Sequence, residues 1–138
     1  MLRLDADGLR AFLAAEFPQA VDTGMQIEAV DMHGVRLSWT VGEAHLRPGR
    51  TVSGPTLMTL VDTAAYLVVL SRLGPVALAV TTNLEMHFLR RPSPGALTAT
   101  ARPLKLGRRR VVVQAEVQAD VGGGRDVVAA ATVTYALP

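Results

Sequence analysis

One carboxylate, Asp62, and one glycine eight residues before it, Gly54, have the spacing and surroundings that acyl-group chemistry needs. Asp62 stands beside Leu60, Val61 and small apolar residues. It must find hydrogen-bond partners or hold its proton more tightly, because desolvation disfavours the charged form. Such a carboxylate can take a proton from water or attack a carbonyl carbon itself. A glycine N–H at a helix start can stabilise the resulting oxyanion, because the helix dipole favours negative charge there and no side chain hinders the approach.

The element that must position both groups is a long helix. Ser53 or Gly54 can serve as its N-cap, and Pro55 suits its first turn, where a missing N–H costs nothing. Gly74 followed by Pro75 is the matching stop signal. Between these limits the residues are apolar or small on nearly every side, which predicts a helix covered by other structure.

The spacing of the two groups along this helix has a geometric consequence. Eight residues of helix place Gly54 and Asp62 roughly 12 Å apart, too far to act on one carbonyl from the same chain. We therefore expect a site between two subunits. Two plainer interpretations stay open. In the first, Asp62 lies at a solvent-exposed edge of the helix, or accepts hydrogen bonds from a neighbouring chain, and takes part in no reaction. In the second, the helix spans a membrane, because the apolar run approaches the length that such a helix needs. The central carboxylate and the lack of flanking anchors argue against a membrane partner.

The rest of the chain alternates between helix and strand patterns. Residues 7–16 form an amphipathic helix that ends near Pro18, residues 25–41 are typical of a β-hairpin, and residues 42–52 of a loop. Four strand patterns follow the long helix, over residues 76–88, 96–104, 110–119 and 127–137. This order predicts an α+β fold, one domain over residues 1–138, in which an antiparallel sheet of about six strands curls around the helix.

The clearest period-two pattern lies in residues 76–88, and one face of that strand should cover the helix. The residues expected on the covered face are Val76, Leu78, Val80, Leu84, Met86 and Phe88. The opposite face would carry Ala77, Ala79, Thr81, Asn83, Glu85 and His87.

Composition narrows the classes of partner and cofactor. The chain has no cysteine, which excludes disulfides and thiolate chemistry, and its three histidines follow no metal-ligand spacing, so we expect no metal. The net charge is +2, and clustered Arg and Lys residues suit a phosphate-bearing ligand. An aromatic content of 4% argues against binding of single-stranded nucleic acid, and the sequence shows no helix-turn-helix or zinc-finger pattern, so a nucleotide-bearing small molecule fits at least as well. No basic segment followed by an apolar one opens the sequence, so we expect a cytoplasmic protein.

Two stretches, residues 47–55 leading to Asp62 and residues 79–92, resemble the hot-dog thioesterases of the phenylacetic-acid-degradation (PaaI) type. In that family a His-Gly-Gly turn starts the central helix, and an Asp follows the first Gly by eight residues. Gly54 and Asp62 keep that spacing. Ser53 stands in place of the usual His, Pro55 in place of a frequent second Gly, and Arg47 where several members have Asn. The resemblance covers about residues 25–137 and implies a hot-dog fold and sites between subunits.

The resemblance also implies roles for individual residues in acyl-CoA hydrolysis. Asp62 would be the general base or nucleophile, the Gly54 N–H the main oxyanion donor with Ser53 beside it, and Thr81 a holder of the attacking water or an ordinary strand residue. The expected contacts to acyl group and coenzyme A are Arg47, Pro55, Leu57, Met58, Asn83, Arg90, Arg91, Lys105, Arg108 and Arg109. Coenzyme A enters only as part of the substrate, and the expected assembly is a homodimer or a dimer of dimers.

Two alternatives to hydrolysis remain open at this point. A non-catalytic acyl-CoA binding or sensing module could have kept the pocket after Ser53 and Arg47 replaced groups that catalysis needs. A hot-dog dehydratase acting on hydroxyacyl thioesters is the other possibility, although that chemistry usually pairs an acid with a His, and Ser53 precedes Gly54 here.

Overall fold

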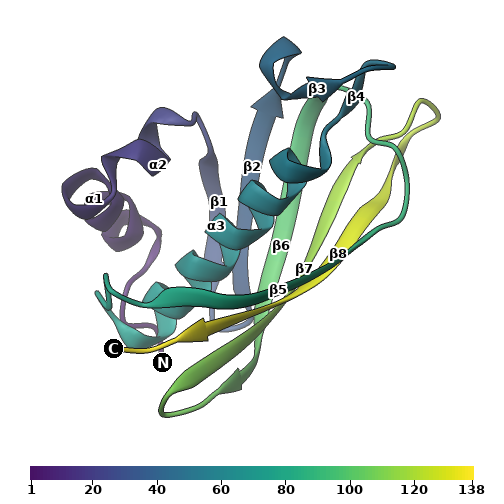
Figure 1. Ribbon diagram of the computed structural model, residues 1–138. Helices are drawn as coiled ribbons and strands as arrows, with labels where there is room; N and C mark the ends of the chain where they lie inside the picture. The colour runs from purple at the N-terminus through teal and green to yellow at the C-terminus, as the bar shows by residue number, and fades with distance from the viewer.

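The computed structural model describes residues 1–138 and shows an antiparallel sheet curved around one long helix (Figure 1). The helix is α3, Gly54–Leu73. The strand order in the sheet is β1 (Gln26–Asp31), β2 (Gly34–Val41), β6 (Gly95–Leu106), β7 (Arg110–Asp120), β8 (Arg125–Ala136) and β5 (Val80–Phe88). Every neighbouring pair is antiparallel. The predicted α+β hot-dog arrangement is confirmed, with β1 and β5 at the two edges.

Helix α3 begins and ends where its capping residues predict. Ser53 is the N-cap, and its hydroxyl accepts a hydrogen bond from the N–H of Thr56. At the other end Gly74 adopts φ 92° and donates its N–H to the carbonyl of Leu70. By length and composition α3 could span a membrane, but 67% of that segment is buried inside this fold. The sheet of the same chain therefore covers most of its apolar surface.

The N-terminal segment contains more helix than predicted. Helix α1 is Ala6–Glu16, with Leu9 and Leu13 buried against the rest of the core. Pro18 was expected to mark its end, but it also begins a second short helix, α2, Pro18–Asp22. Proline suits this role because its fixed φ and missing N–H cost nothing in a first turn. Helix α1 contacts α2, the edge strand β1 and α3, and the two helices lie beside β1 (Figure 1).

The segment predicted as a loop before α3 also contains regular structure. It holds a short 3-10 helix, η1 (Glu43–His45), and a small hairpin of β3 (Leu46–Arg47) and β4 (Thr51–Val52). The N–H of Ser53 donates to the carbonyl of His45 at 2.9 Å, which ties the hairpin to the start of α3.

A bulge near the start of β5 changes the predicted register of that strand. Thr81 pairs with Tyr135 of β8, but Asn83 pairs with Thr134, so the pairing gains one extra residue, Thr82. An extra residue reverses the sides on which all earlier residues of a strand lie. A pattern of alternating residue types cannot reveal it.

Because of this bulge, the predicted faces of β5 are wrong before Thr82. Thr81 faces α3 on the same side as Leu84 and Met86, although it was expected on the opposite face. Leu78 and Val80, expected to cover the helix, are exposed. The strand places a hydroxyl, rather than an apolar side chain, opposite the middle of α3.

Candidate functional site

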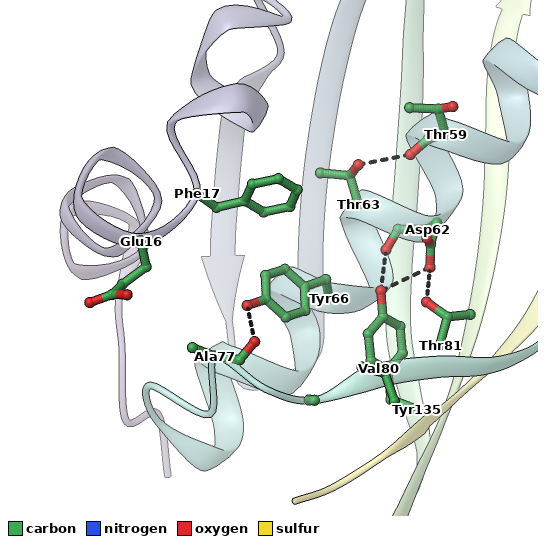
Figure 2. A pocket seen from close by; sticks show the side chains of 11 residues that line it. Glu16, Phe17, Thr59, Asp62, Thr63, Tyr66, Ala77, Val80, Thr81 and Tyr135 are labelled. Atoms are coloured by element: carbon green, nitrogen blue, oxygen red, sulfur yellow. Dashed lines mark hydrogen bonds between the residues drawn. The ribbon is translucent and has the colours of Figure 1, made fainter.

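A pocket of about 570 Å³ opens beside the middle of α3 (Figure 2). Four residues of the helix, at positions i, i+3, i+4 and i+7, face it: Thr59, Asp62, Thr63 and Tyr66. The other walls come from the junction of α1 and α2, the turn before β5, the start of β5 and the end of β8: Glu16, Phe17, Ala77, Ala79, Val80, Thr81 and Tyr135. The pocket therefore joins segments from both ends of the sequence.

The carboxylate of Asp62 is half-buried at the wall of this pocket, and two hydroxyl groups hold it. Thr81 Oγ1 donates to its Oδ1 at 2.6 Å, and the Tyr135 hydroxyl donates to the same oxygen at 2.8 Å (Figure 2). Both donors come from the sheet, whereas Asp62 comes from the helix. No group of the chain donates a hydrogen bond to Oδ2. One carboxylate oxygen is thus fixed, and the other is left for a ligand or water.

The two tyrosines of the chain meet at this site. Tyr66 and Tyr135 stack with their ring centroids 5.8 Å apart, and Tyr66 meets the edge of Phe17 at 6.2 Å. Burial raises the pKa of the Tyr135 phenol, and the nearby Asp62 carboxylate raises it further. Burial likewise raises the pKa of the Tyr66 phenol, assisted by the charge of Glu16. Both phenols therefore stay protonated at neutral pH and act as hydrogen-bond donors.

Gly54 lies at the first position of α3, and its N–H has no acceptor within the chain. A Cβ placed on Gly54 would meet only the ring of Phe88, at 3.5 Å, an ordinary van der Waals contact. A small side chain would therefore fit at this position without a steric clash. Ser53, one residue earlier, uses its hydroxyl on Thr56, 2.7 Å from Thr56 Oγ1, so its observed role is to cap the helix.

The residues predicted to contact the acyl group do not lie together in the structure. Leu57 is buried in the core cluster and is not among the residues that line the Asp62 pocket. Pro55 and Met58 are exposed on the outer side of α3. Asn83 pairs with Thr134 beyond the bulge, so it lies on the side of β5 that faces away from the helix. Only Asp62 and Thr81 of the predicted residues line the pocket.

The predicted phosphate contacts, together with Arg47, fall into two groups at opposite ends of α3. Arg90 pairs with Asp126 at 3.0 Å and donates to the carbonyl of Val127, so its charge is already matched. Arg91 and Arg47 are exposed near the start of the helix and form no ion pair.

The second group lies in the turn between β6 and β7, beside the C-terminus (Figure 1). Lys105, Arg108 and Arg109 line an open depression there together with Arg110. None of these four side chains forms an ion pair. The clustering seen in the sequence therefore becomes one basic surface at the end of α3 that is remote from Gly54.

Sequence reasoning missed Tyr135, Tyr66 and Phe17 as site residues. A signal was available for Tyr66, which follows Asp62 by four positions and so shares its helix face. Tyr135 lies 73 positions after Asp62, and only the pairing of β8 with β5 brings the two together. Phe17 depends on the unpredicted helix α2, of which it is the N-cap.

Comparison with known proteins identifies the family. Residues 49–125 match the model of the thioesterase superfamily, which is more than half of the chain. No functionally curated protein sequence matches the chain. A solved structure of a candidate thioesterase from Silicibacter sp. TM1040 is similar at a TM-score of 0.87 and 42% identity; the match covers 100% of this chain and 94% of that one.

Proteins of phenylacetic acid degradation are also similar. A phenylacetic acid degradation-related candidate thioesterase from Ralstonia eutropha JMP134 has 28% identity and a TM-score of 0.79, with 93% of this chain and 98% of that chain covered. A single-residue variant of PaaI from Thermus thermophilus, at 24% identity, shares the fold with a TM-score of 0.75 over 88% of this chain and 99% of its own. The chain therefore belongs to the thioesterase superfamily, and PaaI proteins are among its structural neighbours.

Proposed function

We propose that this protein hydrolyses the thioester of a small to medium acyl- or aryl-CoA, at a site that two subunits share. Family membership supports hydrolysis of thioesters. The observation that carries the finer proposal is the carboxylate of Asp62, whose Oδ1 is held by Thr81 and Tyr135 at the wall of a pocket of about 570 Å³. The free Oδ2 is the atom that would take a proton from water or attack the carbonyl carbon.

The hydrogen bonds of Thr81 favour a water molecule as the attacking group. A threonine hydroxyl has one proton, and Thr81 donates it to Asp62. The Thr81 hydroxyl can therefore only accept a hydrogen bond from any further group, such as a water molecule. A water beside the pair would donate one proton to Asp62 Oδ2 and the other to Thr81, which leaves its lone pair free for the carbonyl carbon. In this arrangement Asp62 is the general base, although the same Oδ2 could form an acyl-enzyme directly.

The hydroxyl groups that line the Asp62 pocket already donate to other atoms of the chain, so the oxyanion that forms in this step needs another donor. The Gly54 N–H is unpaired and lies at the positive end of a 20-residue helix, so it suits a developing oxyanion. Gly54 and Asp62 both belong to α3, and helix geometry places them about 12 Å apart. A second copy of the chain, with its α3 antiparallel to the first, would bring its own Gly54 to the Asp62 pocket. Two equivalent sites would result.

The edge strand β5 supports the same assembly. It pairs with β8 on one side only, so its other edge presents unpaired backbone groups over nine residues. Its end is apolar and open: Phe88 is 52% and Leu89 51% exposed. A long edge strand with unpaired backbone groups is an aggregation hazard unless another chain pairs with it. Pairing of two β5 strands would cover this edge and hold the two α3 helices side by side.

The basic residues would then bind the phosphates of coenzyme A. Arg47 and Arg91 are unpaired and lie near the start of α3, so they would come from the same subunit as Gly54. Lys105, Arg108 and Arg109 lie at the other end of the helix and form a second candidate surface. A phosphate gains most from guanidinium groups that have no carboxylate partner, which favours Arg91 over Arg90.

Complementation between two inactive variants tests the shared site. Asp62→Asn removes the base, and Gly54→Pro removes the N–H at a helix position that tolerates proline. Each variant alone should be inactive. In a mixture half of the randomly paired dimers are mixed, and each has one intact site, so about a quarter of wild-type activity should return. A mixture as inactive as its components would contradict a site between subunits.

A further inference from the structure

A second cavity, partly open to solvent, shares one lining residue, Thr63, with the pocket of the proposed active site. It has a volume of about 230 Å³ and lies between α1, α2, β1 and α3. Eight of its eleven lining residues are apolar: Leu13, Ala14, Ala20, Val21, Met25, Ile27, Leu37 and Leu67. Arg10, Gln26 and Thr63 complete the wall. The proposed hydrolysis of the thioester assigns no role to any of these residues, and only Thr63 also lines the first pocket.

Two polar residues of this second cavity, Arg10 and Thr63, already form hydrogen bonds within the chain. The guanidinium of Arg10 pairs with Asp7 at 2.9 Å and donates to the carbonyl of Ile27 at 3.0 Å. The hydroxyl of Thr63 donates to the carbonyl of Thr59 at 2.8 Å, within its own helix. Both groups are satisfied without a ligand, so the cavity can hold an apolar group and leave neither of these donors unpaired.

Thr63 is the one residue that lines both cavities. It follows Asp62 directly and precedes Leu67 by one helix turn, so it lies between the face of α3 that carries the carboxylate and the face that lines the second cavity. Phe17, at the junction of α1 and α2, approaches this boundary from the other side (Figure 2). Thr63 and the two N-terminal helices thus stand between the reacting carboxylate and the second cavity.

We propose that the second cavity receives the distal end of the acyl chain and sets the chain length that the protein accepts. This inference rests on the proposed hydrolysis of acyl-CoA thioesters, whose carbonyl would lie beside Asp62. An apolar cavity of about 150 Å³ is sufficient for a ligand of the size of benzene, so about 230 Å³ has room for several methylene groups. The lining is aliphatic, which suits an unbranched aliphatic chain. A short acyl group would fill only the first pocket.

Two variants that narrow the second cavity test this role by binding rather than turnover. Ala14→Leu adds bulk at its wall, and Thr63→Leu adds bulk at the boundary between the cavities. Ala15→Leu is the matched control, because Ala15 is exposed on the same helix and lines neither pocket. The probes are non-hydrolysable thioether analogues of butyryl-CoA and dodecanoyl-CoA, and calorimetry gives the Kd of each.

The ratio of the two Kd values decides the outcome. Each methylene that leaves water contributes about fourfold to affinity, so exclusion of two or more should weaken dodecanoyl binding by at least about tenfold relative to butyryl binding. A shift of that size in either cavity variant, absent from Ala15→Leu, supports the proposal. A ratio unchanged in both, or no binding of either analogue, overturns it. If the variants show the shift but the wild type releases no thiol from the matching thioesters, the proposed hydrolysis alone is contradicted.

Discussion

The hydroxyl of Tyr135 lies 2.8 Å from the side-chain Oδ1 of Asp62 and 3.1 Å from its backbone carbonyl oxygen. A residue of the last strand is thereby attached to the middle of the central helix. The phenol is buried, and its pKa is raised by that burial, so it keeps its proton. This contact holds Oδ1 of the carboxylate in place and leaves Oδ2 without a hydrogen bond from the chain.

Replacement of Tyr135 should affect the chemical step more than substrate binding. Tyr135→Phe keeps the ring, its burial and its stacking on Tyr66, but removes the hydrogen bond to Asp62. We expect kcat to fall about tenfold, equivalent to about 1.4 kcal/mol, with KM nearly constant. Steady-state kinetics on an acyl-CoA would check this. A higher KM at constant kcat would instead place Tyr135 among the groups that bind substrate.

The role of Thr81 depends on its hydroxyl rather than its shape. Thr81→Val keeps the size and the strand preference but removes both the donor to Asp62 and the acceptor for water. Its kcat should fall by about ten- to a hundredfold, or about 1.4–2.7 kcal/mol, in the range of a lost hydrogen bond to a charged group. Thr81→Ser is the matched control and should keep most activity. Equal rates for Val and Ser variants would show that Thr81 only fills the strand.

The oxyanion role of Gly54 can be separated from its size. Gly54→Ala keeps the N–H, and its Cβ would meet the ring of Phe88 at an ordinary 3.5 Å. Gly54→Pro removes the N–H, and its kcat should fall about a hundredfold or more relative to Gly54→Ala, as is typical of a lost oxyanion donor. Thermal melting would verify that both variants fold. Similar kcat values would mean that another donor stabilises the oxyanion.

The raised pKa of Tyr135 predicts a loss of stability in alkaline solution. The unfolded chain releases the phenol proton near pH 10.0, whereas the folded chain keeps it. Below pH 10 the phenol is protonated in both states, so its contribution to the free energy of unfolding is fully present. Above pH 10 the free energy of unfolding falls, by up to about 1.4 kcal/mol per pH unit. Urea unfolding between pH 9 and pH 11 should show this slope, reduced in Tyr135→Phe. The same slope in both proteins would assign it to other groups.

The sequence predicts the central helix and the antiparallel sheet well, because these depend on local signals. Ser53 and Gly74 cap the helix, and apolar residues fill the space between them. The short turn at Gly34 and the turn after Leu106 likewise define hairpins by themselves. Where capping residues, alternation and turn chemistry agree, the fold class follows.

The site is only partly predictable, because its partners meet through tertiary structure. Asp62 was identified as an ionisable group in an apolar segment, and the structure places Thr81 beside it. Tyr135 could not be found, since its contact with Asp62 depends on strand order. The bulge at Thr82 reversed the predicted side of Thr81, and no pattern of residue types encodes such a bulge.

The most direct test of the central claim is thiol release from acyl-CoA thioesters by the wild type and by Asp62→Asn. The substitution keeps the shape of the side chain and removes its charge and basicity. With a panel of short, long and aryl acyl groups, we expect turnover of at least one class. Its kcat should fall at least about a hundredfold in Asp62→Asn, roughly 2.7 kcal/mol of transition-state stabilisation. Equal rates in the two proteins, or no turnover by a wild type that still binds acyl-CoA, would contradict Asp62 as the catalytic group and favour a binding protein.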